Sequence, residues 1–196
     1  MVGSIFLREG VYHVTRTLRL NRRVHIFGRG RAELRGLSPA GSHFIVSTSS
    51  SATLDRLRID NQAKSGSCIL YITAGHLRLQ SCDVSCKVGN DGLILYASGP
   101  STIADALGCS FSGGGGIAYW DGASGRVEGC RISNVSGGAG ITLGDAGTSP
   151  LVSRNTIHDC NNGVRILRDV DPSWTLGEGN VITDCAEGDV VDVRAH

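Results

Sequence analysis

The residues of this chain with the most evident capacity for chemistry are three aspartates that recur at one place in successive stretches of sequence. Asp121, Asp145 and Asp169 lie five, five and six residues after the glycine that opens each stretch. Three carboxylates in a column could bind a cation. Two of them could also act as acid and base on a saccharide, since glycosidic cleavage needs two carboxyl groups about 5–10 Å apart. These three residues are the catalytic candidates if the protein is an enzyme.

Aromatic and basic side chains accompany this acidic column. Tyr96 and Trp120 are expected to face outward beside it, and Arg165 and Arg168 extend the same flank. An exposed aromatic surface next to carboxylates commonly stacks on sugar rings, and it also suits a protein partner. We therefore take Trp120, Tyr96, Arg165 and Arg168 as the candidate ligand-binding residues.

The acidic column also has a purely structural explanation. Aspartate often ends a strand because its side chain accepts hydrogen bonds from the turn amides that follow. On this interpretation, which we favour, the three carboxylates belong to turns and perform no chemistry.

Cysteines and asparagines share one position of the repeated stretches. Cys82, Cys109 and Cys130 occupy it in three stretches, and Asn155 and Asn180 occupy it in the next two. This pattern predicts an interior ladder of stacked thiols that continues into stacked amides bonded from one stretch to the next.

A second cysteine column contains Cys160 and Cys185. Neighbouring stretches could bring such pairs within disulfide range, but the chain has seven cysteines, an odd number, and no visible leader. Reduced, buried thiols are therefore expected, and the cytoplasm or another reducing compartment is favoured.

Metal ligands and cofactor motifs are not evident. The six histidines never pair at ligand spacing; they are His13, His25, His43, His76, His158 and His196. No phosphate-binding loop and no Cys-x-x-Cys motif occurs. We expect no metal site and no cofactor.

The overall charge is nearly balanced, with 19 Lys and Arg against 18 Asp and Glu, a net charge of +1. A general nucleic-acid binder would carry a basic surplus, so no nucleic-acid partner is expected. No apolar run approaches the roughly 20 residues that span a bilayer, so no transmembrane segment is expected either.

These candidates can be positioned only by a repeat of short strands. One apolar residue recurs after steps of 25, 27, 21, 25 and 25 residues, at Ile59, Val84, Phe111, Ile132, Ile157 and Ile182. Strands this short cannot bury a face alone, but stacked coils can. The period predicts an all-β chain, a single-stranded right-handed parallel β-helix with coils of about 21–27 residues, forming one domain over residues 1–196. A sandwich of short strands is the alternative.

Alternation within the strands predicts which side chains face inward. The inward columns are Leu93, Ile117, Ile141 and Val164, and then Leu95, Tyr119, Leu143 and Ile166. The residues between them, Ile94, Ala118, Thr142 and Arg165, are expected to point outward.

Two stretches resemble a known superfamily. The first begins Ile5-Phe-Leu-Arg-Glu-Gly-Val-Tyr12 and continues to Ile26-Phe-Gly-Arg-Gly30. It looks like the opening coils of pectate-lyase-like β-helix proteins. The stretch from Ser149 to Leu167 is similar to carbohydrate-binding and sugar-hydrolase type repeats, as in F-box-only ubiquitin-ligase adaptors and Shc-binding spindle proteins. The resemblance implies the fold, and its matched positions are turn and core positions.

The resemblance implies chemistry less well. The Asn-x-Asp, Asp-Asp, Gly-His-Gly and Arg-x-Lys motifs of polygalacturonase-like hydrolases do not occur. We therefore expect a non-catalytic recognition or scaffold module that binds a protein or glycan partner. The alternatives are a polysaccharide lyase or hydrolase acting on acidic glycans and a structural subunit of a larger assembly. No end cap is recognised in the sequence, which predicts end-to-end association or assembly into a larger complex.

Overall fold

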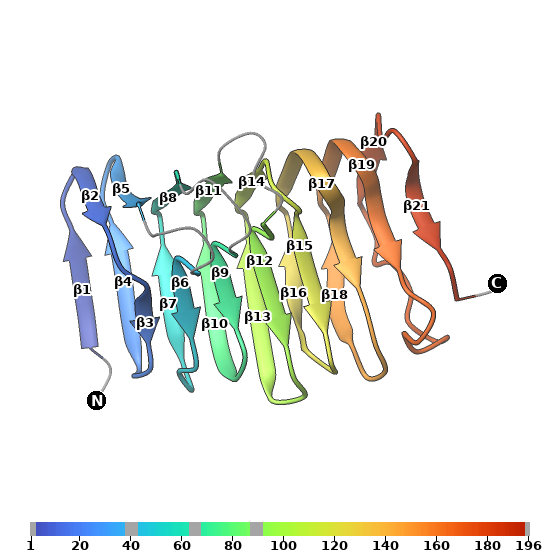
Figure 1. Ribbon diagram of the computed structural model, residues 1–196, viewed down its shortest axis with the longest axis horizontal. Coiled ribbons are helices and arrows are strands. Elements are labelled where there is room, and N and C mark those ends of the chain that lie inside the picture. The colour runs from blue at the N-terminus through green and yellow to red at the C-terminus, as the bar shows by residue number, and fades with distance from the viewer. Residues whose placement is uncertain (1–2, 38–42, 63–67, 87–91, 195–196) are drawn as a thin grey trace.

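The computed structural model describes residues 3–37, 43–62, 68–86 and 92–194, and every regular element in these ranges is a β-strand. All strand pairs are parallel. Successive turns of the chain lie side by side and form a long solenoid (Figure 1). The predicted all-β parallel solenoid is confirmed. Within the described ranges, no helix has the length and apolar character needed to cross a membrane.

The strands of the turns lie on three faces. Face A is a seven-stranded sheet of β1 (Gly3–Leu7), β4 (Val24–Gly28), β7 (Ala52–Asp55), β10 (Gly75–Gln80), β13 (Thr102–Leu107), β16 (Ser124–Glu128) and β18 (Ser149–Ser153). These seven strands mark about seven turns of the solenoid.

The second sheet folds over the other two faces. Face B holds β2 (Gly10–Val14), β5 (Ala32–Gly36), β8 (Arg58–Asn61), β11 (Asp83–Cys86), β14 (Ser110–Ser112) and β20 (Val181–Thr183). Face C holds β3 (Leu18–Leu20), β6 (Ile45–Ser47), β9 (Leu70–Ile72), β12 (Leu95–Ser98), β15 (Ile117–Trp120) and β21 (Gly188–Asp192). The long strands β17 (Arg131–Leu143) and β19 (Thr156–Ile166) run from face B onto face C and join the two faces.

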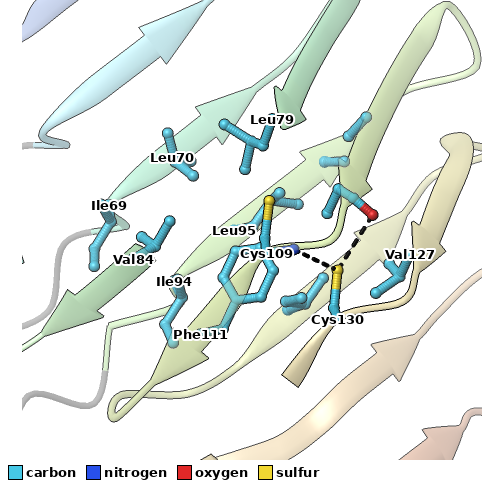
Figure 2. Packing of buried hydrophobic residues seen from close by; sticks show 14 of the residues in the cluster. Ile69, Leu70, Leu79, Val84, Ile94, Leu95, Cys109, Phe111, Val127 and Cys130 are labelled. Atoms are coloured by element: carbon cyan, nitrogen blue, oxygen red, sulfur yellow. Dashed lines mark hydrogen bonds between the residues drawn. The ribbon is translucent and has the colours of Figure 1, made fainter. Parts of the chain in front are cut away.

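Inward rows of identical or similar side chains form the core. The row predicted from the repeat is paired residue by residue, through Ile59, Val84, Phe111, Ile132, Ile157 and Ile182. Adjacent strands lie about 4.7–4.9 Å apart, so each side chain is covered by its counterparts in the neighbouring coils. Figure 2 shows part of this packing, in which Leu70 and Leu95 come from adjacent coils.

The predicted register of one coil was wrong. Leu95, rather than Leu93, pairs with Ile117, and Ala97, rather than Leu95, pairs with Tyr119. Ile94 is fully buried instead of facing outward. Aligning the chain by its glycines misplaced this coil by two residues, because the hydrogen bond from the Ile94 amide to the Gly116 carbonyl sets the stagger.

The rest of the face C columns is as predicted. Ile117, Ile141 and Val164 form one inward row and Tyr119, Leu143 and Ile166 form the next. Ala118, Thr142 and Arg165 occupy the outward row. Ala118 is buried, at 1% exposed, although it belongs to the outward row and is not part of the apolar core.

A left-handed residue turns the chain between faces A and B in successive coils. These residues are Arg56 (φ 52°), Ser81 (50°), Gly108 (58°), Gly129 (64°), Arg154 (56°) and Gly179 (73°). The next residue inward belongs to the predicted ladder: the Cys82 and Cys130 thiols donate to the carbonyls of Leu54 and Ala106, each at 3.3 Å. The Asn155 amide continues the pattern by donating to the carbonyl of Val127 at 2.8 Å. The ladder of thiols and amides is confirmed, and Figure 2 shows the hydrogen bonds around Cys130.

Replacing Ile141 by Ala should lower the free energy of unfolding by about 2–5 kcal/mol, as for other large-to-small changes in a core. Thr142→Ala, on the outward side of the same strand, should change it by no more than about 0.5 kcal/mol. Urea denaturation of both variants measures the difference. Equal losses at the two sites would contradict the alternation described above.

Gly108→Ala should lower the free energy of unfolding by about 1–2 kcal/mol, because an alanine in the left-handed region is strained. No atom lies within 4 Å of the added Cβ, so steric crowding is not the cause. Gly108→Asn should cost less, since asparagine tolerates this conformation better. Thermal unfolding of the two variants provides the measurement. An asparagine variant less stable than the alanine variant would contradict the explanation.

Candidate functional site

The acidic column lies where the chain leaves face C. Asp121 and Asp145 both have positive φ, 54° and 67°, at equivalent corners of adjacent coils. Aspartate is among the few residues other than glycine that enter this conformation readily. Their recurrence therefore has a backbone explanation that needs no chemistry, besides the capping of turn amides that the sequence suggested. Continuing the register of β17 and β19 sets Arg168 beside Asp145, and Asp169 lies one residue further along.

The first two carboxyl groups lie close enough to affect each other. The Ser98 hydroxyl donates to Asp121 Oδ2 at 2.5 Å. Partial desolvation raises the pKa of Asp145, and the hydrogen-bonded, like-charged side chain of Asp121 raises it further. Asp169 adds a smaller repulsion.

The position of the Trp120 side chain is fixed by packing. It ends β15 and points outward, and its ring lies against Gly144 of the next coil, where an added Cβ would be 2.6 Å from Cε3 and Cζ3 of the indole. Only glycine at position 144 leaves room for the ring in this orientation. The indole is therefore held in place before any ligand arrives, directly beside Asp121.

A stack of rings continues the outward row of face C. Tyr71 and Tyr96 pair across β9 and β12, with ring centroids 5.5 Å apart and an interplanar angle of 7°. His43 stacks on Tyr71 at 4.1 Å and 5°. Burial raises the pKa of Tyr96, so its phenol keeps its proton and remains a hydrogen-bond donor.

The two candidate arginines lie on the same flank but further along the solenoid. Arg165 continues the outward row after Thr142. Both Arg165 and Arg168 are exposed, and neither forms an ion pair with another residue in the described part of the chain. We call the combination of Tyr71, Tyr96, Ser98, Trp120, Asp121 and Asp145 the face-C site.

Three members of this neighbourhood were missed by sequence reasoning: Tyr71, Ser98 and Gly144. A signal for Tyr71 was present, because Ile-Leu-Tyr occurs at residues 69–71 and again at 94–96, one coil apart. Alignment on that tripeptide would also have given the correct register for Leu95. Nothing in the sequence singles out Ser98 or Gly144, whose roles depend on residues 23 and 24 positions away.

Other reactive groups have structural partners. The Asp105 carboxylate on the outside of face A is 4% exposed, with His76 Nε2 at 2.9 Å and the Arg78 and Arg126 guanidinium groups each at 3.5 Å. This network neutralises a carboxylate that would otherwise be buried without a partner. Within the described ranges, no three His, Cys, Asp or Glu side chains are grouped as a metal site. His196 lies outside those ranges.

All seven cysteines are free thiols. The hydrogen bond with Cys109 is the main cause that raises the pKa of both Cys82 and Cys130, and burial of the two thiols raises it further. Burial raises the pKa of Cys160 to about 11, and Cys185 lies close enough to contribute. Cys82, Cys130 and Cys160 are therefore neutral thiols at physiological pH, which makes them poor nucleophiles. The hydrogen bonds with Cys130 and Cys82 instead lower the pKa of Cys109, which lies between them in the ladder.

Asp121→Asn should lower the pKa of Asp145 toward its ordinary value, because the amide removes the like charge. Partial desolvation should keep the remaining pKa somewhat raised. A carboxyl-detected NMR titration of the wild type and the variant measures this shift. An unchanged Asp145 pKa would show that the two carboxylates are not coupled. Asp169→Asn, which removes the weaker neighbour, is the matched control and should have a smaller effect.

Comparison with known proteins gives the family. A family model described as a right-handed β-helix region matches residues 42–194, more than three quarters of the chain. No curated protein matches. Among solved structures, ORF18 of Geobacillus virus E2 is similar at 12% identity with a TM-score of 0.43, over 97% of this chain and 53% of that one. The present chain thus spans about half the length of that protein. From the fold and the family match together, the chain belongs to the right-handed β-helix family.

Proposed function

We propose that this protein is a non-catalytic recognition module that binds a glycan at the face-C site. The observation that carries the proposal is the indole of Trp120, seated on Gly144 beside Asp121. A ring already ordered in the free protein offers an apolar surface without the entropy cost of fixing a mobile side chain. Carboxylates next to it accept hydrogen bonds from hydroxyl groups, which is what a sugar ring presents at its edge.

The neighbouring side chains fit the same ligand. The Tyr96 phenol is a protonated donor, and Ser98 holds Asp121 through a short hydrogen bond. A donor and an acceptor thus belong to the same site as the aromatic surface, as in sites that fix the orientation of a mostly apolar ligand with a few polar groups. Arg165 and Arg168 lie along the same flank, where a longer or acidic glycan would meet them.

A second candidate function is cleavage of an acidic polysaccharide by the aspartates. The raised pKa of Asp145 beside the carboxyl group of Asp121 favours it, because a general acid needs a pKa above that of an ordinary carboxyl group. The absence of the polygalacturonase-like motifs from the sequence argues against it. Binding without cleavage is therefore the better supported function.

Trp120→Ala should weaken glycan binding by about 30-fold or more, since truncating a central aromatic of a binding site often costs at least about 2 kcal/mol. Gly144→Ala should also weaken it, because the new Cβ displaces the indole while leaving every polar group of the site in place. Titration calorimetry against an oligosaccharide panel, with ligands first chosen on a glycan array, measures both effects.

The matched control is Phe6→Ala, which removes a half-exposed ring from face A and should leave glycan affinity unchanged. A panel without any binding glycan would contradict the proposal. Specific binding of a protein that also depends on Trp120 would replace the glycan by a protein partner. Cleavage of polyuronates by the wild type, abolished when Asp121, Asp145 and Asp169 are all changed to Asn, would establish the enzymatic alternative instead.

A further inference from the structure

A groove lies along the edge between face A and face B, where the chain passes from one face to the other in the first four coils. Two cavities, of about 610 and 500 Å³, meet there and share Gly30 and Arg56. The larger extends along the edge from Glu9 past Arg58 to Asp83. Because those residues come from successive coils, the groove runs along the axis of the solenoid and suits a linear ligand.

Guanidinium groups dominate this groove. Four arginines line the two cavities: Arg29, Arg31, Arg56 and Arg58. Arg56 is 3.1 Å from Asp55, and Arg58 is 3.8 Å from Glu33. Arg29 and Arg31 are exposed, and among the described residues neither has an acidic partner. They flank Gly30, where the two cavities meet.

Three carboxylates also line the groove and reduce its charge: Glu9, Glu33 and Asp83. Glu33 is already neutralised, because Arg35 Nε donates to its Oε1 at 2.6 Å. Glu9 lies over Gly30, with its Oε2 3.4 Å from where a Cβ would be. Arg29 and Arg31 are thus matched in number by Glu9 and Asp83, which also have no ion-pair partner among the described residues, so the groove selects ligands through shape and stacking as well as charge.

Aromatic rings form the wall of the smaller cavity. Phe6 and Phe27 lie in adjacent coils on the outward row of β1 and β4, with ring centroids 5.4 Å apart. The ring of His25 lies against that of Phe27, with the two ring centroids 4.9 Å apart. The two rings of Phe6 and Phe27 offer a surface on which planar groups can stack, and the guanidinium groups beside them can contact anions. This combination suits planar bases linked by phosphates.

The charge of the chain is unevenly distributed along the sequence, and the basic part includes most of the groove. Residues 1–58 contain ten arginines and three carboxylates, a formal charge of +7. Residues 59–196 contain nine Lys and Arg against fifteen Asp and Glu, a formal charge of −6. The near-zero total conceals a basic segment at the coils that bear the groove. The argument from total charge against a nucleic-acid partner therefore does not apply to this end of the molecule.

We propose that the groove binds single-stranded nucleic acid. Arg29, Arg31, Arg56 and Arg58 contact successive phosphates, and bases stack on the ring wall of Phe6 and Phe27. A basic channel that follows the backbone, combined with aromatic side chains under the bases, is the general means by which proteins bind single strands without sequence preference. The face-C site takes no part in this binding.

A fluorescently labelled oligothymidylate of about 12 nucleotides, within the usual site size for single strands, is the probe. The double variant Arg29→Gln/Arg31→Gln should weaken binding at least about tenfold, because each lost contact is a charged hydrogen bond. It should also lower the magnitude of the slope of log K against log salt by about 1.4, at about 0.7 per phosphate contact on a single strand. Phe6→Ala should weaken binding about fivefold or more through lost stacking.

Arg165→Gln/Arg168→Gln removes the same charge from face C and is the matched control, expected to leave affinity and slope unchanged. Circular dichroism of each variant verifies that the solenoid is retained. Absence of oligothymidylate binding, or equal losses in the two double variants, would overturn the proposal. Dextran sulfate that binds as tightly as the oligonucleotide and is insensitive to Phe6→Ala would overturn it in favour of a sulfated glycan.

Discussion

Each coil of this protein must return the chain to the same three faces in register with the coil before it. Every inward side chain is then covered by its counterparts above and below, and the backbone groups of one coil pair with those of the next. The left-handed corner residues, such as Arg56 and Gly108, contribute to this return because each turns the chain from face A to face B at a single residue. Just inside this corner, the Cys82–Cys130 thiols and the Asn155 amide bond from coil to coil and keep the turns aligned.

This constraint also decides where function can lie. Inward rows are occupied by the core, so only outward rows and corners are available for ligands. Because the register repeats, similar residues on these surfaces are brought into line: Tyr71 with Tyr96 as a stack, and Asp121 with Asp145 as a coupled pair of carboxylates. The same corner geometry that favours aspartate for its backbone conformation thus also brings two carboxyl groups close together.

The sequence was sufficient wherever the repeat itself carried the information. The row from Ile59 to Ile182, the alternation around Ile141 and the ladder through Cys130 were all predicted from spacing alone. It failed at the coil of Leu95, where more residues separate β11 from β12 than separate β14 from β15, so alignment on the glycines gave the wrong stagger. The hydrogen bond from Ile94 to the Gly116 carbonyl sets that stagger, and it forms only between stacked coils.

By itself, the sequence determined that the chain folds as a parallel β-solenoid, because strands this short at a period near 25 residues can bury apolar side chains only by stacking. It also determined that aspartates recur at one corner. Only the tertiary structure decided which outward residues work together. Trp120 is seated on Gly144, and Arg31 lines a groove with Arg56, because stacking places residues about one coil apart in sequence side by side. Contacts of this kind depend on the exact stagger and on loop lengths, which periodicity alone does not specify.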